Sequence, residues 1–182
     1  MLSTMSKESE DLVPDYDDPK ELWAYFGIAF YRANVLEQGV LNMAVGLLAK
    51  NAPGITRDQM NSLYDSLNSK TFGQVLGVAR KYFEFSDELA SDLASALEYR
   101  NYLAHGFFVR HDIDLLSESG KRKMIDELVK IASYIKQVDR QMDPIWMSAW
   151  EHLGVTREWI AEQMNRYVQE RQQEAAAEKS TV

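Results

Sequence analysis

Apolar residues recur three and four positions apart along most of the chain, a spacing typical of amphipathic α-helices. No segment alternates apolar and polar residues over the length of a strand. The pattern therefore predicts an all-α fold, a bundle of four to six helices. Helices are expected over residues 20–50, 57–67, 71–83, 86–106, 121–142 and from 156 to about 172.

Capping residues indicate where several of these helices begin and end. Thr56 with Gln59 fits a capping box, and Ser86 precedes two acidic residues. A hydroxyl oxygen accepts hydrogen bonds from the free amides of a first turn, and carboxylates suit its positive end. Gly106 is expected to end or bend the helix that starts at Ser86, and Pro144 to end or kink the helix over 121–142.

Composition fits one globular domain between two flexible ends. The 182 residues are 46% hydrophobic and 26% charged, which is enough apolar surface for one core. We interpret residues 1–19 as a flexible acidic leader, 20–170 as a single domain and 171–182 as a disordered tail. The leader has no apolar stretch of the signal-peptide kind, no membrane span is expected, and the absence of cysteine suits a reducing compartment. We expect a cytoplasmic protein with no membrane partner.

The chain is acidic, with a formal net charge of −8. Neutralising nucleic-acid phosphates requires clustered Lys and Arg, so this charge argues against a protein that coats nucleic acid, and no DNA partner is expected. A small basic cleft in an acidic body stays compatible with it.

Two residues of opposite charge lie within apolar stripes. At about 100° per residue, Arg100 falls in the stripe of Leu93 and Leu103, and Glu37 falls at the centre of the stripe that carries Phe30. An unpaired buried ion costs several kcal/mol, so we predict that the two form a buried ion pair. The pair could be purely structural. Alternatively, Glu37 orients the guanidinium toward a phosphate at the border of a cleft, because the planar fork of arginine serves both groups.

Asn101 and His105 lie four residues apart and therefore point the same way. His105 lies about 140° around the helix from Arg100, so one ligand touches both only at the helix edge, at a bend near Gly106, or in a groove completed by a second subunit. By spacing alone, a lone histidine is more often a surface residue or a satisfied core group than a catalyst. Both interpretations stay open on the residues alone.

The segment RNYLAH at residues 100–105 resembles the R-x4-6-H signature of the HEPN superfamily, with the usual polar residue directly after the arginine. The long first helix with an inward acid at Glu37 is similar to that family's first helix, and the likeness covers about residues 20–140. The resemblance implies an up-and-down helical bundle that forms a homodimer in which the signature helices meet. It also implies a metal-independent endoribonuclease without cofactors, of the toxin or antiviral-defence kind.

The same resemblance gives Arg100 and His105 catalytic roles and Asn101 a positioning role. His105 would take the proton of a ribose 2′-hydroxyl or protonate the leaving 5′-oxygen, since histidine changes protonation near neutral pH. Arg100 would stabilise charge on the phosphate. An antitoxin or regulatory protein is implied as a further partner. Some toxins of the family carry a modifiable tyrosine two residues after the histidine, where this chain has Phe107. The alternative is a non-catalytic dimerisation or nucleotide- or RNA-binding module.

Other polar and aromatic clusters are weighed against a plain surface role. His111, Asp112 and Asp114 lack the spacing of metal ligands on one helix face, so a solvated loop and no metal site are expected. The tryptophans near the C-terminus favour helix packing or a partner surface over base stacking. The cationic residues considered for contacts with an RNA backbone are Arg80, Lys81 and Arg110, with Lys121, Arg122 and Lys123 as a solvated helix start.

Overall fold

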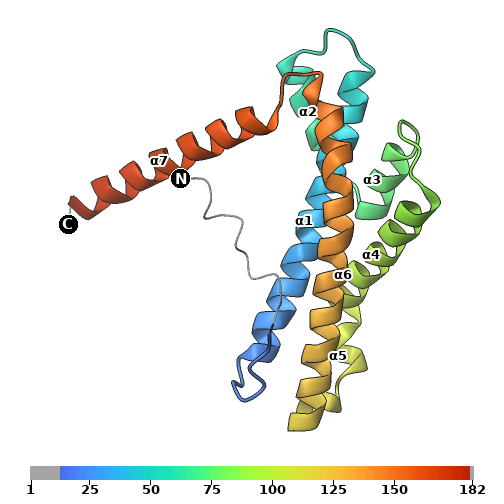
Figure 1. Ribbon diagram of the computed structural model, residues 1–182, viewed down its shortest axis with the longest axis vertical. Coiled ribbons are helices and arrows are strands. Elements are labelled where there is room, and N and C mark those ends of the chain that lie inside the picture. The colour runs from blue at the N-terminus through green and yellow to red at the C-terminus, as the bar shows by residue number, and fades with distance from the viewer. Residues whose placement is uncertain (1–12, 181–182) are drawn as a thin grey trace. The chain divides into compact units, whose positions relative to one another are not determined.

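The computed structural model describes residues 13–180, with side chains for residues 13–176 (Figure 1). All regular structure in this range is helical, which confirms the all-α prediction. Residues 1–12 of the expected leader and 181–182 of the expected tail lie outside the described range. No described helix has the length and apolar character that crossing a membrane requires. The elements are α1 Glu21–Lys50, α2 Arg57–Asn68, α3 Phe72–Ala79, α4 Asp87–His105, α5 Phe107–Arg110, the 3-10 helix η1 Asp114–Leu116, α6 Glu118–Glu151 and α7 Arg157–Ser180.

The chain divides into two compact units. Unit 1 takes the described residues up to Gly39 together with Glu84–Gln141, and unit 2 takes the described residues of Val40–Phe83 and from Met142 onward. The helices α1 and α6 therefore contribute their N-terminal parts to unit 1 and their C-terminal parts to unit 2. The whole 100–105 segment and Glu37 belong to unit 1.

The predicted helix starts are supported by their caps. Thr56 Oγ1 accepts from Gln59 N at 3.3 Å while Gln59 Oε1 accepts from Thr56 N at 2.9 Å, which completes the expected capping box. Ser86 Oγ accepts from the backbone of the first turn of α4 at 3.2 Å. This helix ends at His105, with Gly106 as its C-cap.

Two helices run further than expected. Helix α6 continues through Pro144 to Glu151, although an interior proline costs about 3 kcal/mol. Burial of Met147 and Ala149 after the proline explains the continuation, since packing of an apolar face overrides local propensity. Helix α7 reaches Ser180 rather than giving way to a tail at 171, because its Ala-, Glu- and Gln-rich sequence favours helix.

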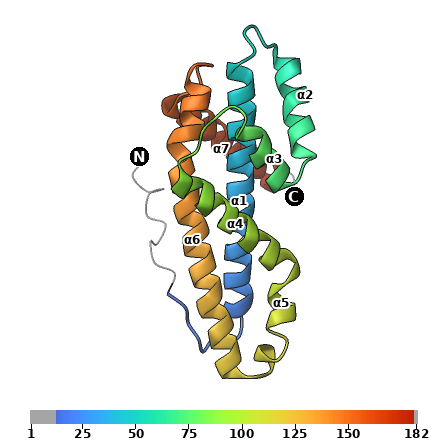
Figure 2. The same cartoon turned by 90° about the vertical axis from the view of Figure 1, so that its right-hand side faces the viewer.

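The core of unit 1 lies among α1, α4, α5 and α6. The N-terminal parts of α1 and α6 run side by side in both views (Figures 1 and 2). On α1 the buried line passes through Tyr25, Ala29 and Leu36, whereas Phe26 and Phe30 are only half-buried. The expectation that Glu37 occupies the centre of the apolar face is therefore wrong. It lies at the edge, because the buried line is centred on Ala29, Ala33 and Leu36. The ring of Phe26 packs beside this line, against Phe30 and the rings of α5.

In unit 2, Trp150 joins α6 to α1. Its Nε1 donates to Asn42 O at 2.9 Å, and a Cβ on Gly46 would come within 2.8 Å of the same nitrogen. The packing role expected for the late tryptophans is thus confirmed for Trp150. Trp159 is 46% exposed.

Candidate functional site

Arg100 and Glu37 join α4 to α1 within unit 1. Arg100 Nε donates to Glu37 Oε2 at 3.2 Å. The two side chains are 29% and 20% exposed. The predicted pairing is confirmed, but the pair lies at the border of the core rather than inside it, because Glu37 is at the edge of the buried line of α1. Part of the pair therefore faces solvent, where a ligand can reach it.

The guanidinium of Arg100 also reaches its neighbour on α4. Its Nη1 donates to Asn101 Oδ1 in a long contact of 3.5 Å. Asn101 is exposed and lies one turn before the exposed His105, on the same side of the helix. The structure thus brings Glu37, Arg100 and Asn101 together. His105 stays further along the helix, with a rise of about 7.5 Å from Arg100.

His105 is the last residue of α4, and the helix is interrupted directly after it. Gly106 caps the helix, its N–H donating to Tyr102 O at 2.8 Å, and α5 begins at Phe107. The break expected at Gly106 is present. Within residues 13–176, no side chain or backbone group bonds the imidazole of His105. Its ring is therefore available to a substrate or to a second chain.

The three candidate contacts to an RNA backbone fall in different units. Arg110 is the exposed last residue of α5 in unit 1. Arg80 and Lys81 are exposed in unit 2, directly after α3. Contact of these three residues with RNA stays a prediction.

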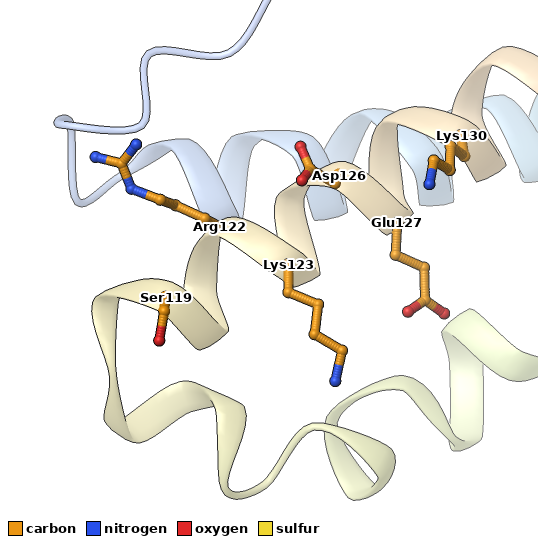
Figure 3. A pocket seen from close by; sticks show the side chains of 6 residues that line it. All are labelled: Ser119, Arg122, Lys123, Asp126, Glu127 and Lys130. Atoms are coloured by element: carbon orange, nitrogen blue, oxygen red, sulfur yellow. The ribbon is translucent and has the colours of Figure 1, made fainter.

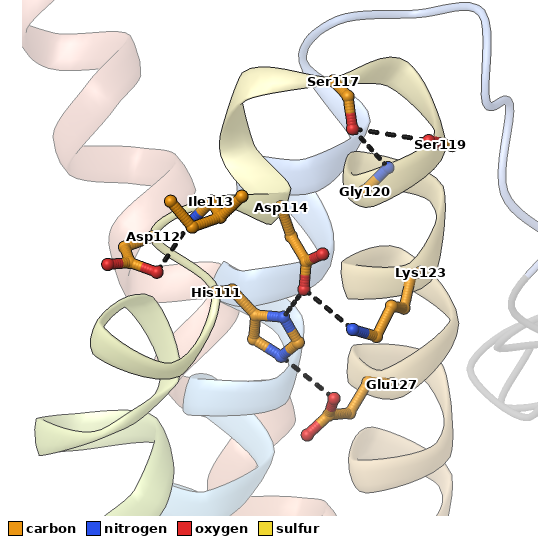
Figure 4. A network of polar contacts seen from close by, with 9 residues as sticks. All are labelled: His111, Asp112, Ile113, Asp114, Ser117, Ser119, Gly120, Lys123 and Glu127. Atoms are coloured by element: carbon orange, nitrogen blue, oxygen red, sulfur yellow. Dashed lines mark hydrogen bonds and ion pairs between the residues drawn. The ribbon is translucent and has the colours of Figure 1, made fainter.

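His111 is buried rather than solvated, which corrects the expectation for this residue, whereas Asp112 beside it is exposed as expected. His111 is 1% exposed, and both ring nitrogens face carboxylates (Figure 4). Nδ1 lies 2.6 Å from Asp114 Oδ2, and Nε2 lies 3.0 Å from Glu127 Oε2. Lys123 Nζ donates to the same Asp114 oxygen at 3.0 Å. This network fastens the segment after α5 to the first turns of α6.

The network shifts the acidity of one of its members. Hydrogen bonds from His111 first, and then from Lys123, hold the pKa of the Asp114 carboxyl below its usual value. Asp112 takes no part, since its Oδ1 accepts from Ile113 N at 2.7 Å (Figure 4). In the sequence, this network is indicated only by the i,i+3 spacing of His111 and Asp114. In the described part of the chain, no group of three or more His, Asp or Glu side chains is arranged to hold a metal ion.

Tyr102, inside the RNYLAH segment, has a buried hydroxyl. Among the described residues no group meets hydrogen-bond geometry with it. Burial, and then the neighbouring carboxylate of Glu127, raises the pKa of Tyr102 to about 12, with Arg110 acting in the opposite direction. Glu127 thus lies between the hydroxyl of Tyr102 and the imidazole of His111.

A surface pocket of about 400 Å³ lies along the first turns of α6 (Figure 3). Several of its charges are paired, Lys123 with Asp114, Glu127 with His111, and Arg122 with Asp17 at 2.9 Å. The pocket therefore presents mixed charge rather than a field of one sign. Its lining residues are Ser119, Arg122, Lys123, Asp126, Glu127 and Lys130.

The candidate site is thus the partly exposed pair of Arg100 and Glu37, with Asn101 in contact with Arg100 and His105 one turn beyond Asn101. Comparison of the chain with protein-family models, with curated proteins and with solved structures gave no match.

Proposed function

We propose that the chain is a metal-independent endoribonuclease of the HEPN type, which works in the cytoplasm as a homodimer with a composite site. One observation carries the proposal. Arg100 is held by Glu37 through Nε and is 29% exposed, and its Nη1 makes only a long contact of 3.5 Å with Asn101. Its helix ends in His105, whose ring no group of the described residues bonds. A guanidinium fixed on one edge keeps donors free for a phosphate on the other.

The chemistry follows from these side chains. His105 takes the proton of a ribose 2′-hydroxyl, and the 2′-oxygen attacks the adjacent phosphorus. The bond from phosphorus to the 5′-oxygen breaks, and this oxygen receives a proton from His105 of the partner subunit. Arg100 stabilises the negative charge that develops on the phosphate oxygens, and Asn101 positions the phosphate. The products end in a 2′,3′-cyclic phosphate and a 5′-hydroxyl.

A second subunit is part of the proposal because one described chain supplies one suitable imidazole. In-line attack needs a base beside the 2′-oxygen and an acid beside the 5′-oxygen, on opposite sides of the phosphorus. His111 is engaged by two carboxylates, and His152 belongs to unit 2. A twin of His105 supplies the missing group. In a toxin or defence system, an antitoxin or regulatory protein would cover this surface.

The test is cleavage of single-stranded RNA in the presence of EDTA by purified wild type, His105→Ala and His152→Ala. His152 is a matched control, because it is also exposed but lies in unit 2. We expect His105→Ala to lose at least about 100-fold in rate with an unchanged thermal melt, and His152→Ala to behave as wild type. Equal cleavage by all three proteins would point to a contaminating nuclease and overturn the proposal.

Arg100→Lys separates the catalytic role of Arg100 from its structural role. Lysine keeps the charge facing Glu37 but loses the planar fork. We expect the cleavage rate to fall about 100- to 1000-fold while the thermal melt stays close to wild type. Wild type that leaves RNA intact while binding it would instead assign the chain to non-catalytic RNA-binding modules.

A further inference from the structure

The most exposed side of α1 in unit 1 carries no charge, and the half-buried Arg32 lies at its border. Between positions 22 and 36 every exposed residue is uncharged, in a chain whose residues are 26% charged and whose net charge is −8. Such a helix side is out of keeping with the rest of the surface. We name it the α1 face, and its members are Trp23, Ala24, Gly27, Tyr31, Asn34 and Val35.

Large apolar side chains stand out from the α1 face. Trp23 is 57% exposed, Tyr31 68% and Val35 38%. Beside them, the ring of Phe108 lies 5.5 Å from that of Trp23, and its neighbour Val109 is 76% exposed. Single exposed apolar residues are ordinary, whereas a contiguous group marks a contact with another molecule.

Gly27 leaves a gap in the middle of the α1 face. A glycine inside a helix costs about 1 kcal/mol relative to alanine. Its φ is not positive, so the backbone conformation does not require it. A Cβ at this position would meet no atom of the chain within 4 Å. No contact within the described chain accounts for the missing side chain, whereas close approach by a helix from outside does.

We propose that the α1 face binds the α1 face of a second copy of this chain. Gly27 and Tyr31 are one helical turn apart, so each copy offers a gap next to a projecting ring. With two α1 helices antiparallel and a two-fold axis at the level of residue 29, Tyr31 of the partner subunit enters the gap at Gly27. The same axis sets Trp23 against Val35 of the partner subunit. One patch thus complements itself, as a two-fold contact requires.

Charge and shape both select a second copy as the occupant. Two chains of net charge −8 repel each other. Contact through an uncharged patch therefore has the lowest electrostatic cost. Nucleic-acid bases could stack on Trp23 and Tyr31, but this stacking would not account for the gap at Gly27. The inference rests on the proposed function only for the need of a partner subunit. Asn34 of the α1 face precedes Glu37 by three residues, about one helical turn, so the contact lies beside the candidate site.

The test is sedimentation equilibrium of the full chain without RNA, for wild type, Gly27→Tyr, Tyr31→Gly and the double variant. We expect a wild-type dimer, and each single change raises the dissociation constant at least tenfold. The double variant returns it to near the wild-type value, because ring and gap again lie opposite each other. Gly77→Tyr is the matched control, since this exposed glycine of α3 also has open space above it, and we expect it to dimerise as wild type.

Three outcomes would overturn the inference: a monomeric wild type, a Gly27→Tyr variant that dimerises as well as Gly77→Tyr, or a double variant no better than the singles. If Tyr31→Gly loses helical signal, Tyr31→Ala opens a similar gap with better helix propensity. The two proposals fail separately. If Gly27→Tyr weakens the dimer but the wild type leaves RNA intact, only the proposed nuclease function is contradicted. If cleavage depends on His105 but Gly27→Tyr leaves the dimer unchanged, only the proposed α1 contact is contradicted.

Discussion

Arg100 and Glu37, 63 positions apart in the sequence, meet through a bond of 3.2 Å from Nε to Oε2, and neither side chain is fully buried. Solvent therefore screens part of their attraction. Breaking a fully buried pair costs about 3–5 kcal/mol, whereas exposed pairs contribute about 0–1 kcal/mol. The pair of this chain falls between these limits.

Replacing the pair with leucines tests its structural share. We expect Arg100→Leu and Glu37→Leu each to lower the free energy of unfolding by about 1–2 kcal/mol. The double variant should lose clearly less than the two losses together, because neither charge is then left without its partner. Urea unfolding followed by circular dichroism measures all four proteins. Strictly additive losses would show that the bond contributes no coupling.

Removing the hydroxyl of Tyr102 is expected to stabilise the protein. The hydroxyl is buried without a hydrogen bond among the described residues, and an unsatisfied buried group costs about 1–3 kcal/mol. Tyr102→Phe should therefore raise the free energy of unfolding by about 1 kcal/mol at neutral pH. Tyr134→Phe is the control, because its hydroxyl donates to Asp92 at 2.8 Å and its loss should destabilise.

Tyr102 also makes the stability of the fold depend on pH in the alkaline range. The folded-state pKa of Tyr102, about 12, lies above that of an unfolded tyrosine, so the unfolded chain loses this proton first as the pH rises. The wild type is then destabilised between about pH 10 and 12. Tyr102→Phe lacks this proton, so its advantage over wild type should widen in that range. A constant difference across it would contradict the burial of this hydroxyl.

Asp114 makes the stability of the fold depend on pH in the acid range. Its folded-state pKa is lowered by His111 and Lys123, so the ionised carboxylate stabilises the fold at neutral pH, and this contribution is lost as the pH falls through the lowered pKa. Asp114→Asn should be less stable than wild type at neutral pH, with the gap narrowing below about pH 4. Asp112→Asn removes an exposed carboxylate outside the network and serves as control. A gap that persists in acid would contradict the assignment.

Gly120 is needed for the close approach of two backbone segments. A Cβ there would lie 2.1 Å from the carbonyl oxygen of Asp114, so the start of α6 and η1 would have to separate. We expect Gly120→Ala to lower the free energy of unfolding by about 1–3 kcal/mol. Gly77→Ala, in open space on α3, should instead stabilise by up to about 1 kcal/mol. Thermal melts of both variants decide the matter.

The pairing of Arg100 with Glu37 could be predicted because each charge interrupts an apolar stripe, and a one-dimensional pattern shows this directly. The position of the pair at the border of the core could not. A helical wheel counts Phe26 as core, whereas the structure turns its ring sideways against Phe108, at 4.8 Å between centroids. Which apolar residue faces inward depends on neighbouring helices, and these are not visible in the spacing.

The burial of His111 lay beyond the sequence for a similar reason. Asp114 is near enough to suggest a local bond, but Glu127 comes from another helix, 16 residues further on. From its sequence alone, a polar segment with two aspartates is predicted to be a solvated loop. Its contact with Glu127 depends on the position of α6. The course of α6 through Pro144 also depends on burial of the residues that follow, because local propensity alone would end the helix there.

Phe107 lies at the centre of four other rings and is 1% exposed. An enzyme that silences a protein by attaching a group to a side chain needs an accessible oxygen or nitrogen to attack. This position offers neither access nor such an atom while unit 1 is folded. Covalent silencing through this position is therefore excluded while unit 1 is folded, and control of the proposed nuclease would have to act at another place.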